Sequence, residues 1–309
     1  MSSEVRVSAP AKINLHLGVG AVRPDGYHPL VTVFQSVGLY DELTLRPART
    51  SSMTVSGEGI EVAAVPTGPS NLVLRAVEVL AEHHHRPDLA VSAHLRKRIP
   101  VAGGLAGGST DAAAALVGVD SLFELHTPRQ ELHDLAATLG SDVPFCLHGG
   151  TALGTGRGEE LAPLMSRGDY WWVLLPDDDG LSTPAVYSAY DLLGEHAPEP
   201  EPPTALLSAL RVGDVARVGE LLHNDLAAAA YSLRPDLAQV VEAGAECGAF
   251  GGLVSGSGPT IAFLCSDAEH AAYVDARLQD TLGTSPAIVV NAPAHGARVV
   301  GARVGGIYQ

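Results

Sequence analysis

The 309-residue sequence predicts a mixed α+β protein of two lobes that join at about residue 165. Three observations support this fold class. Hydrophobic residues make up 46% and charged residues 17% of the chain, which is enough apolar material for a substantial core. A chain of about 300 residues suits two domains or one large one. Strand-like and helix-like patterns also occur on both sides of a composition shift at Pro163–Asp169. We therefore expect one domain over residues 1–165 and a second over residues 166–309.

The N-terminal segment is predicted to be mainly strands. Apolar and polar residues alternate in Glu4–Ser8, Ile13–Val19 and Leu43–Arg46, which is the period of a half-buried strand. The first clear helix is expected to begin with Ser70 as its N-cap. The apolar residues that recur at helical spacing after this cap are Leu72, Ala76, Val79 and Leu80.

A strand at Val91–Leu95 leads into the part of the chain richest in glycine, Ile99–Ser109. The alanine-rich stretch Asp111–Val117 that follows favours helix. The sequence therefore predicts a glycine loop that feeds directly into a helix.

The next helix has clear start and stop signals. Thr127 is expected to be the N-cap, Pro128 to occupy the first turn, and Gln130 to complete a capping box. Gly140 follows the last turn, where glycine commonly ends a helix.

The glycine-rich hairpin Gly149–Gly158 precedes the second half, which begins with a strand at Tyr170–Leu175. His196–Pro203 is rich in proline and acidic residues, so an exposed connection is expected there. A glycine-rich hairpin at Gly251–Pro259 precedes a strand at Thr260–Leu264. A helix is expected to start at Ser182-Thr183-Pro184. The further helices that we expect in this half are Thr204–Arg211, Asp214–His223, Pro235–Cys247 and Ala268–Leu282.

The charge balance limits the partners of the protein. Asp and Glu total 35 against 19 Lys and Arg, which gives a formal net charge of −16. Binding to a phosphate backbone needs clustered cations, so we expect neither a nucleic acid nor a membrane surface as partner. No apolar run reaches the roughly 18 residues of a spanning helix, and no N-terminal leader pattern is present. The three separated cysteines are expected to be apolar fillers of a reduced, cytoplasmic protein.

Pro100–Asp111 carries the strongest chemical signal. Glycines let the backbone approach a ligand closely, and the following helix would direct its free N–H groups at an anion. The segment matches neither of the common nucleotide-binding glycine patterns, and no Lys follows its glycines. A flexible turn is the alternative. Ser109 and Thr110 are suited to donating to phosphate, to holding Mg²⁺ or to capping the helix.

A second group of candidates lies in Pro10–His28. Lys12 interrupts an apolar strand, where a charge needs a partner, and Asn14 projects from the same face. Tyr27 and His28 follow a turn and offer a flat ring beside a hydrogen-bonding imidazole, which suits a heteroaromatic base. An edge lysine and a surface turn are the alternatives.

Two later segments add a carboxylate and a second small-residue loop. Asp142 stands between the helix-ending Gly140 and an apolar Val-Pro-Phe, where a carboxylate is a general-base candidate or the cap of a short turn. Ser255–Thr260 (SGSGPT) is a loop that can lie against phosphate, or an ordinary hairpin. Glu159 and Glu160 are placed to brace Arg157, without a defined catalytic role.

Together, PAKINLHL with RPDGYH, PVAGGLAGGSTDAAA, GSDVPF and SGSGPT resemble the motifs of the GHMP kinase superfamily, in its order and over residues 10–260. Their particular forms resemble the members that phosphorylate a cytidine diphosphate derivative of methylerythritol in the non-mevalonate isoprenoid route. The resemblance implies a two-lobe fold with the active site in the cleft between the lobes, with ATP as co-substrate and Mg²⁺ as cofactor. The Mg²⁺ ligands and the oligomeric state are left open.

The resemblance also implies roles for individual residues. Asp142 would accept the proton of a tertiary C2 hydroxyl, and Lys12 would orient it and offset negative charge. The substrate residues would be Asn14, Tyr27, His28, Thr183 and Tyr187, with Tyr27 and Tyr187 on either side of the cytosine; the family often has Phe at the latter position. The ATP-binding residues would be Pro100, Val101, Ala102, Gly103, Gly104, Leu105, Ala106, Gly107, Gly108, Ser109 and Thr110.

Two other functions remain open at this point. One is a GHMP kinase of another small alcohol, of the homoserine or mevalonate type, which would not need Tyr27, His28 and Tyr187. The other is a nucleotide-binding regulator without catalysis, against which the presence of both Lys12 and Asp142 argues.

Overall fold

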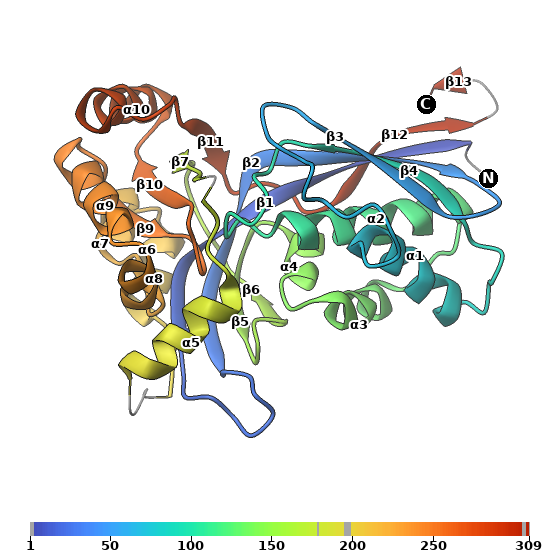
Figure 1. The fold of residues 1–309 in the computed structure, drawn as a ribbon, viewed down its shortest axis with the longest axis horizontal. Helices are drawn as coiled ribbons and strands as arrows, with labels where there is room; N and C mark the ends of the chain where they lie inside the picture. Colours follow the sequence, from blue (N-terminus) through green and yellow to red (C-terminus); the bar gives the residue numbers. More distant parts are fainter. Residues whose placement is uncertain (1–2, 178, 195–198, 305–306, 309) are drawn as a thin grey trace.

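The computed structural model describes residues 3–177, 179–194, 199–304 and 307–308. Two sheets with helices packed on them build the molecule, which confirms the α+β class (Figure 1). The main path of the larger sheet has the order β13-β12-β1-β2-β4-β3, with β5 and β8 pairing to β2 and β1, and β6 to β5. Its strands are β1 (Glu4–Val19), β2 (Leu30–Pro47), β3 (Ser52–Gly57), β4 (Val91–Lys97), β5 (Thr151–Thr155), β6 (Glu160–Pro163), β8 (His223–Asn224), β12 (Arg298–Val304) and β13 (Ile307–Tyr308).

Strand β1 connects two hydrophobic cores. Val5, Val7 and Ala9 pack into the core beneath the larger sheet, whereas Ala11 and Ile13 pack into a second core shared with the rest of the chain. Its pairing with β2 has irregularities after Pro10 and after Asn14. β1 is longer than its alternating pieces predict because both of its faces are largely buried.

Helices from the first half cover one face of the larger sheet (Figure 1). They are α1 (Leu72–His83), α2 (Gly107–Phe123), α3 (Arg129–Leu139) and α4 (Val143–His148). Alanines of α2 are fully buried, so this helix lies close to the strands.

Two predicted caps of these helices are wrong. Asn71, not Ser70, caps α1, because its side chain accepts the N–H of Val73. The capping box of α3 does not form: Pro128 is the N-cap residue, and the Gln130 side chain donates to Asp134 instead. Gly140 ends α3 as predicted.

The smaller sheet has the order β11-β7-β10-β9 and carries the remaining helices. The strands are β7 (Tyr170–Leu175), β9 (Gly251–Val254), β10 (Ile261–Cys265) and β11 (Ile288–Ala292). The helices are α5 (Thr183–Leu193), α6 (Thr204–Val212), α7 (Val215–Glu220), α8 (Ala227–Leu233), α9 (Asp236–Glu246) and α10 (Ala268–Leu282).

Several boundaries of the second half agree with the sequence, and two short helices were not expected. β7 and α10 begin and end at the predicted residues. Helix α8 and helix α4 are short and mostly apolar, so neither shows a helical period. Part of the predicted connection His196–Pro203 lies outside the described residues. The division at about residue 165 stays a prediction, and β12 from the second half pairs with β1 in the larger sheet.

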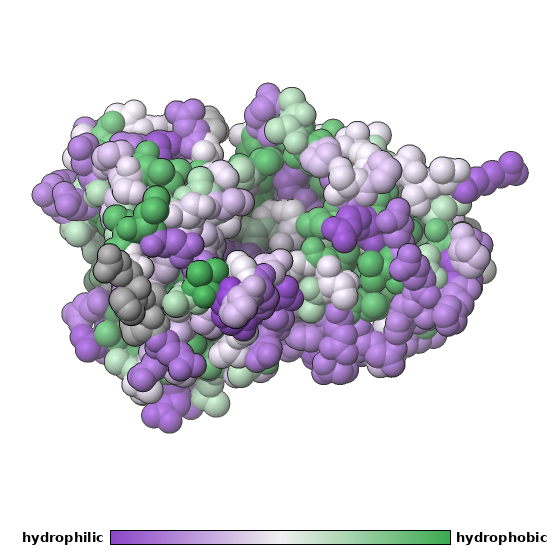
Figure 2. Space-filling model, turned by 60° about the horizontal axis from the view of Figure 1, so that its bottom comes forward, coloured by the Kyte–Doolittle hydropathy of each residue, from purple (hydrophilic) through white to green (hydrophobic). Residues whose placement is uncertain are grey.

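A hollow opens in the middle of the molecular surface, between its two halves (Figure 2). It corresponds to a cleft of about 490 Å³. Residues from both halves line it, including Lys12, Ser109 and Asp142 from the first and Thr183 and Tyr187 from the second. Among the described residues, no helix is long and apolar enough to cross a membrane.

Candidate active site

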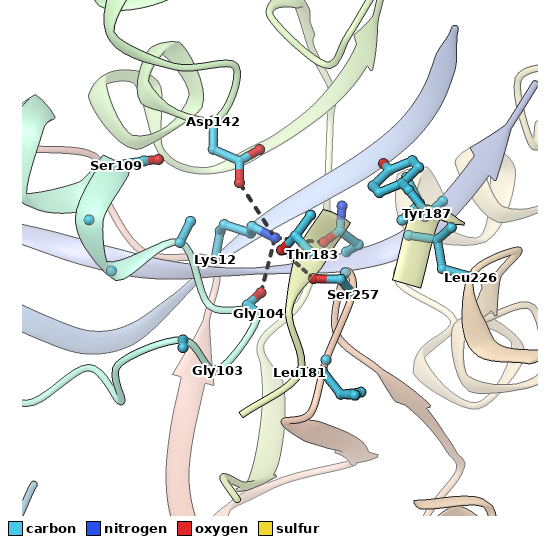
Figure 3. A pocket seen from close by; sticks show the side chains of 18 of the residues that line it. Lys12, Gly103, Gly104, Ser109, Asp142, Leu181, Thr183, Tyr187, Leu226 and Ser257 are labelled. Carbon is cyan, nitrogen blue, oxygen red and sulfur yellow. Dashed lines mark hydrogen bonds and ion pairs between the residues drawn. The ribbon is translucent and has the colours of Figure 1, made fainter. Parts of the chain in front are cut away.

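Lys12 lies at the centre of the cleft on β1 and is only 5% exposed (Figure 3). Its Nζ donates to Asn14 Oδ1 at 2.8 Å and to the carbonyl oxygen of Gly104 at 3.1 Å. Asn14 in turn donates to Thr32 Oγ1 at 2.8 Å. These contacts explain how a charge is tolerated in an apolar strand and fix the direction of the ammonium group.

Asp142 lies immediately before α4, and its side chain points toward Lys12 (Figure 3). The Oδ2 atom lies 3.8 Å from Lys12 Nζ, and the carboxylate side chain is 34% exposed. The structure therefore brings the two residues together as an ion pair with the carboxylate open to the cleft. A hydroxyl bound between them would contact both a proton acceptor, Asp142, and a cation, Lys12.

The glycine loop places a helix N-terminus beside this pair. Ala106 adopts a left-handed conformation with φ of 59° and offers no side-chain cap, and α2 begins at Gly107. The first-turn residues of α2 line the cleft, and no N-cap side chain accepts from the backbone N–H groups at this helix start. The loop and first-turn residues that line the cleft are Ala102, Gly103, Gly104, Ala106, Gly107, Gly108 and Ser109.

Four residues of the predicted phosphate segment lie away from the main cleft. Leu105 is 1% exposed in the core, and buried Thr110 donates its hydroxyl to the carbonyl of Pro10 at 2.9 Å. Pro100 and Val101 line a second cavity of about 190 Å³ on the other side of the loop. Ala102, Gly107 and Gly108 line both cavities, so the start of α2 separates them.

The SGSGPT loop holds the glycine loop from the opposite half. Ser255 Oγ donates to the carbonyl of Gly104 at 3.1 Å, and Ser257 Oγ lies 2.8 Å from Thr183 Oγ1. Asn224 fixes this loop from behind by donating to the carbonyl oxygens of Val254 and Gly256. The hydroxyl contacts of Thr183 were not foreseeable from the sequence, because its partner lies far along the chain.

Three ring residues, Tyr27, His28 and Tyr187, were predicted to bind the base. Of these three, Tyr187 lines the cleft. Its ring centroid lies 5.1 Å from that of His28, and burial raises the pKa of its hydroxyl to about 12. His28 is 8% exposed, and its Nδ1 lies 2.8 Å from the carbonyl oxygen of Gly20. Tyr27 is 52% exposed and packs against Arg157. Their roles in base binding stay a prediction.

A buried charge cluster, two members of which line the second cavity, was missed by the sequence analysis. Lys97 Nζ donates to Asp41 Oδ2 at 2.5 Å and to Asp111 Oδ2 at 2.7 Å. Burial raises the pKa of the Asp111 carboxyl well above its usual range, and Lys97 opposes this shift. Two features of the sequence could have indicated this cluster: Lys97 lies shortly after the predicted strand Val91–Leu95, and Asp111 lies at the start of an alanine-rich helical stretch.

Acidic and histidine side chains outside the cleft also have partners within the protein. Arg234 pairs with Asp177 at 2.7 Å, and His83 lies 2.8 Å from Glu131. The three cysteines are buried and free, as expected of apolar fillers. Within the described part of the chain, no group of three or more His, Cys, Asp or Glu side chains is arranged to hold a metal ion.

Comparison with known proteins identifies the family of the chain. Residues 71–150 match the model of the GHMP kinases N terminal domain, and residues 206–282 match that of the GHMP kinases C terminal. The curated 4-diphosphocytidyl-2-C-methyl-D-erythritol kinase of a Nocardioides species is 53% identical, over 94% of this chain and 98% of its own. The chain belongs to the family of 4-diphosphocytidyl-2-C-methyl-D-erythritol kinases.

One further relative and two solved structures are similar to the chain in sequence or in fold. The kinase of the same name from Mycobacterium tuberculosis is 51% identical, over 97% of this chain and 94% of its own. A crystal structure of 4-(cytidine 5'-diphospho)-2C-methyl-D-erythritol kinase matches with a TM-score of 0.75 and 33% identity, over 94% of this chain and 99% of the other. A homoserine kinase from Cytophaga hutchinsonii has the same TM-score at 18% identity, over 97% and 98% of the two chains, and shows the shared fold.

Proposed function

We propose that this kinase transfers the γ-phosphoryl group of ATP to the C2 hydroxyl of 4-diphosphocytidyl-2-C-methyl-D-erythritol, giving the 2-phosphate and ADP. The relatives named for this activity support the substrate. The observation that carries the chemistry is the Lys12–Asp142 pair, which lies in one cleft with the N-terminus of α2. The reaction would serve the non-mevalonate synthesis of isoprenoid precursors.

Asp142 acts as the general base in this proposal. Its carboxylate is open to the cleft, so it can accept the proton of the C2 hydroxyl as that oxygen attacks. Lys12 holds the carboxylate and hydroxyl in position and offsets the negative charge that develops between them. Phosphoryl transfer depends mainly on positioning and charge stabilisation, which is what these two residues and the helix end provide.

The free N–H groups at the start of α2 would bind the phosphates of ATP, and Gly104 and Gly107 let the backbone approach them. We place the adenosine in the second cavity, which adjoins the same helix start and is lined largely by small and apolar residues. Ser109 is the first-turn hydroxyl that remains open to the cleft, so together with the phosphates it fits a Mg²⁺ ion. Such an ion would neutralise charge on the phosphates.

The cytosine would lie at the far end of the cleft against Tyr187, with His28, Tyr27 and Asn14 nearby. Thr183 lines the same part of the cleft and would hydrogen-bond the substrate. No described feature calls for a nucleic acid or membrane partner, and we propose that the reaction takes place in the cytoplasm, where such cysteines stay reduced.

A phosphotransfer screen tests the proposal. The purified protein is incubated with ATP, Mg²⁺ and either the cytidyl substrate, homoserine, mevalonate or no alcohol, and the products are followed by ³¹P NMR. We expect a new phosphomonoester signal with the cytidyl substrate alone. Transfer to homoserine or mevalonate instead would favour another small alcohol, and no transfer to any of them would favour a non-catalytic nucleotide-binding protein.

A further inference from the structure

The cleft contains a second cation that the proposed chemistry does not use. Among the described residues that line the cleft, the cationic side chains are Lys12 and Arg157. Lys12 already contacts Asn14, the Gly104 carbonyl and Asp142, so its ammonium protons are directed at protein acceptors. Arg157 is therefore the cation that remains to bind a substrate anion far from the start of α2.

Arg157 is held in place at the tip of the β5–β6 hairpin. Its backbone N–H donates to Glu159 Oε2 at 2.6 Å, and its Nε donates to Glu159 Oε1 at 3.2 Å. The neighbouring Gly156 has a φ of +71°, and its carbonyl accepts the N–H of Leu30, another cleft residue, at 2.8 Å. The hairpin tip is thus fastened to the segment that carries Tyr27 and His28.

The contacts of the guanidinium group leave donors for a bound anion. Its central carbon lies 5.0 Å from the centroid of the Tyr27 ring, which is within the range of a cation–π contact. Glu159 accepts from Nε and Tyr27 also contacts the group, which leaves N–H donors on the terminal nitrogens for phosphate oxygens. The Arg157 side chain is 35% exposed, so it is open to a ligand in the cleft.

We propose that Arg157 binds the diphosphate of the cytidyl substrate and thereby selects a nucleotide-linked alcohol over a plain one. The inference rests on the proposed function, because the diphosphate belongs to that substrate. It assigns opposite ends of the cleft to the two sets of phosphates: the start of α2 binds those of ATP, and Arg157 binds those that link cytidine to the alcohol. Glu159 and Tyr27 are positioning residues for the guanidinium group.

The test compares wild type, Arg157→Gln, Arg157→Lys and Arg23→Gln. Arg23 is a matched control, because it lies in the same loop as Tyr27 and pairs with Asp25 but does not line the cleft. The KM values of the cytidyl substrate and of ATP are measured, together with the Kd values of CDP and of cytidine by calorimetry with the ATP site saturated by a non-hydrolysable analogue. Thermal melting verifies that each variant folds.

Loss of a charge-assisted contact should raise the KM of the cytidyl substrate and the Kd of CDP by about 10–150-fold in Arg157→Gln. Arg157→Lys should lie in between, because it keeps the charge and loses the paired geometry. The Kd of cytidine and the KM of ATP should stay unchanged, and Arg23→Gln should match wild type.

Three results would overturn the inference: equal weakening of CDP and cytidine, a rise in the KM of ATP instead, or an Arg157→Gln variant with unchanged constants. Each is distinct from a failure of the proposed function, in which wild type itself does not phosphorylate the cytidyl substrate.

Discussion

At the scale of single residues, Asp142 shows how the fold places a carboxylate beside a cation. It stands at the start of α4, a helix that packs against α2, so its carboxylate faces a lysine from β1. Both side chains were candidates in the sequence. Their ion pair was implied there only by the family resemblance, since the two segments are far apart along the chain.

Replacing Asp142 by Asn should remove the proton acceptor and nearly preserve the shape of the site. We expect kcat to fall by about 10²–10⁴-fold if the residue is the general base. The KM of ATP should change little, because α2 and the glycine loop are untouched. Steady-state kinetics with varied ATP and varied alcohol measures both, and unaltered turnover would remove Asp142 from the mechanism.

Tyr187 offers a residue-scale test of base recognition. Loss of a stacking ring costs about 1–3 kcal/mol per base, so Tyr187→Ala should raise the KM of the cytidyl substrate by about 5–150-fold if KM follows affinity. Tyr187→Phe keeps the ring face and should behave nearly like wild type. If the alanine variant has the wild-type KM, the ring does not contact the base.

The sequence predicted which residues lie near the site better than it predicted what each contacts. Lys12, Asn14, Asp142, Thr183 and Tyr187 all line the cleft. Thr110 shows the limit: its hydroxyl is used inside the protein by the carbonyl of Pro10, which a linear pattern cannot reveal. Arg157 carried no motif of its own, and only the folded hairpin brings it to the cleft.

At the scale of elements, the glycine loop is shaped by its contact with the SGSGPT loop. Gly104 has a φ of +75°, and a Cβ atom there would lie 2.2 Å from the carbonyl oxygen of Ser255. Gly108 differs, because it is helical and the nearest atom to an added Cβ, in Leu72, is 3.8 Å away. The glycines of one loop therefore serve different purposes.

Gly104→Ala should lower the free energy of unfolding by more than the roughly 1–2 kcal/mol of a left-handed residue, since the SGSGPT loop must also move. Gly108→Ala, the matched control, should unfold at the same denaturant concentration as wild type or slightly higher. Urea titration followed by circular dichroism compares them. Equal midpoints for the two variants would show that the contact between the loops adds nothing to stability.

Elements with strong local signals were predicted well, and those defined by tertiary contacts were not. α10 has an Asp267 cap and a glycine stop, and both of its ends were predicted. α4 begins only three residues after Gly140 ends α3, so the sequence does not mark it as a separate helix. It is a helix because Val143 and Cys146 fill the core that α2 also lines, while Phe145 stacks on Phe34 of β2. The cap of α1 shifted by one residue because Asn71 competes with Ser70 for the same role.

At the scale of the whole molecule, stability depends on the buried cluster of Lys97, Asp41 and Asp111, which ties β2 and β4 to α2. Lys97→Met would leave the acids without their cation, so we expect a loss of about 3–5 kcal/mol in the free energy of unfolding. Asp111→Asn should cost far less, because it removes a charge that burial already disfavours.

Arg98 provides the control for Lys97. It is the next residue, and its pairing with Glu58 is on the surface, so Arg98→Met should leave the unfolding midpoint almost unchanged. The three variants are compared by urea titration. A Lys97→Met variant as stable as Arg98→Met would mean that the cluster does not stabilise the fold.

The pairing of β1 with β12 has a consequence for the biosynthesis of the protein. Glu4 to Ser8 pair with Arg303 to Arg298, so one edge of β1 waits for residues that are translated much later. At about 5–20 residues per second, that wait lasts on the order of 15–60 s. During it the N-terminal edge is an unpaired template for other strands. Nascent chains on neighbouring ribosomes of one message would meet in this state, so elongation rate and chaperone supply should influence the yield of folded enzyme.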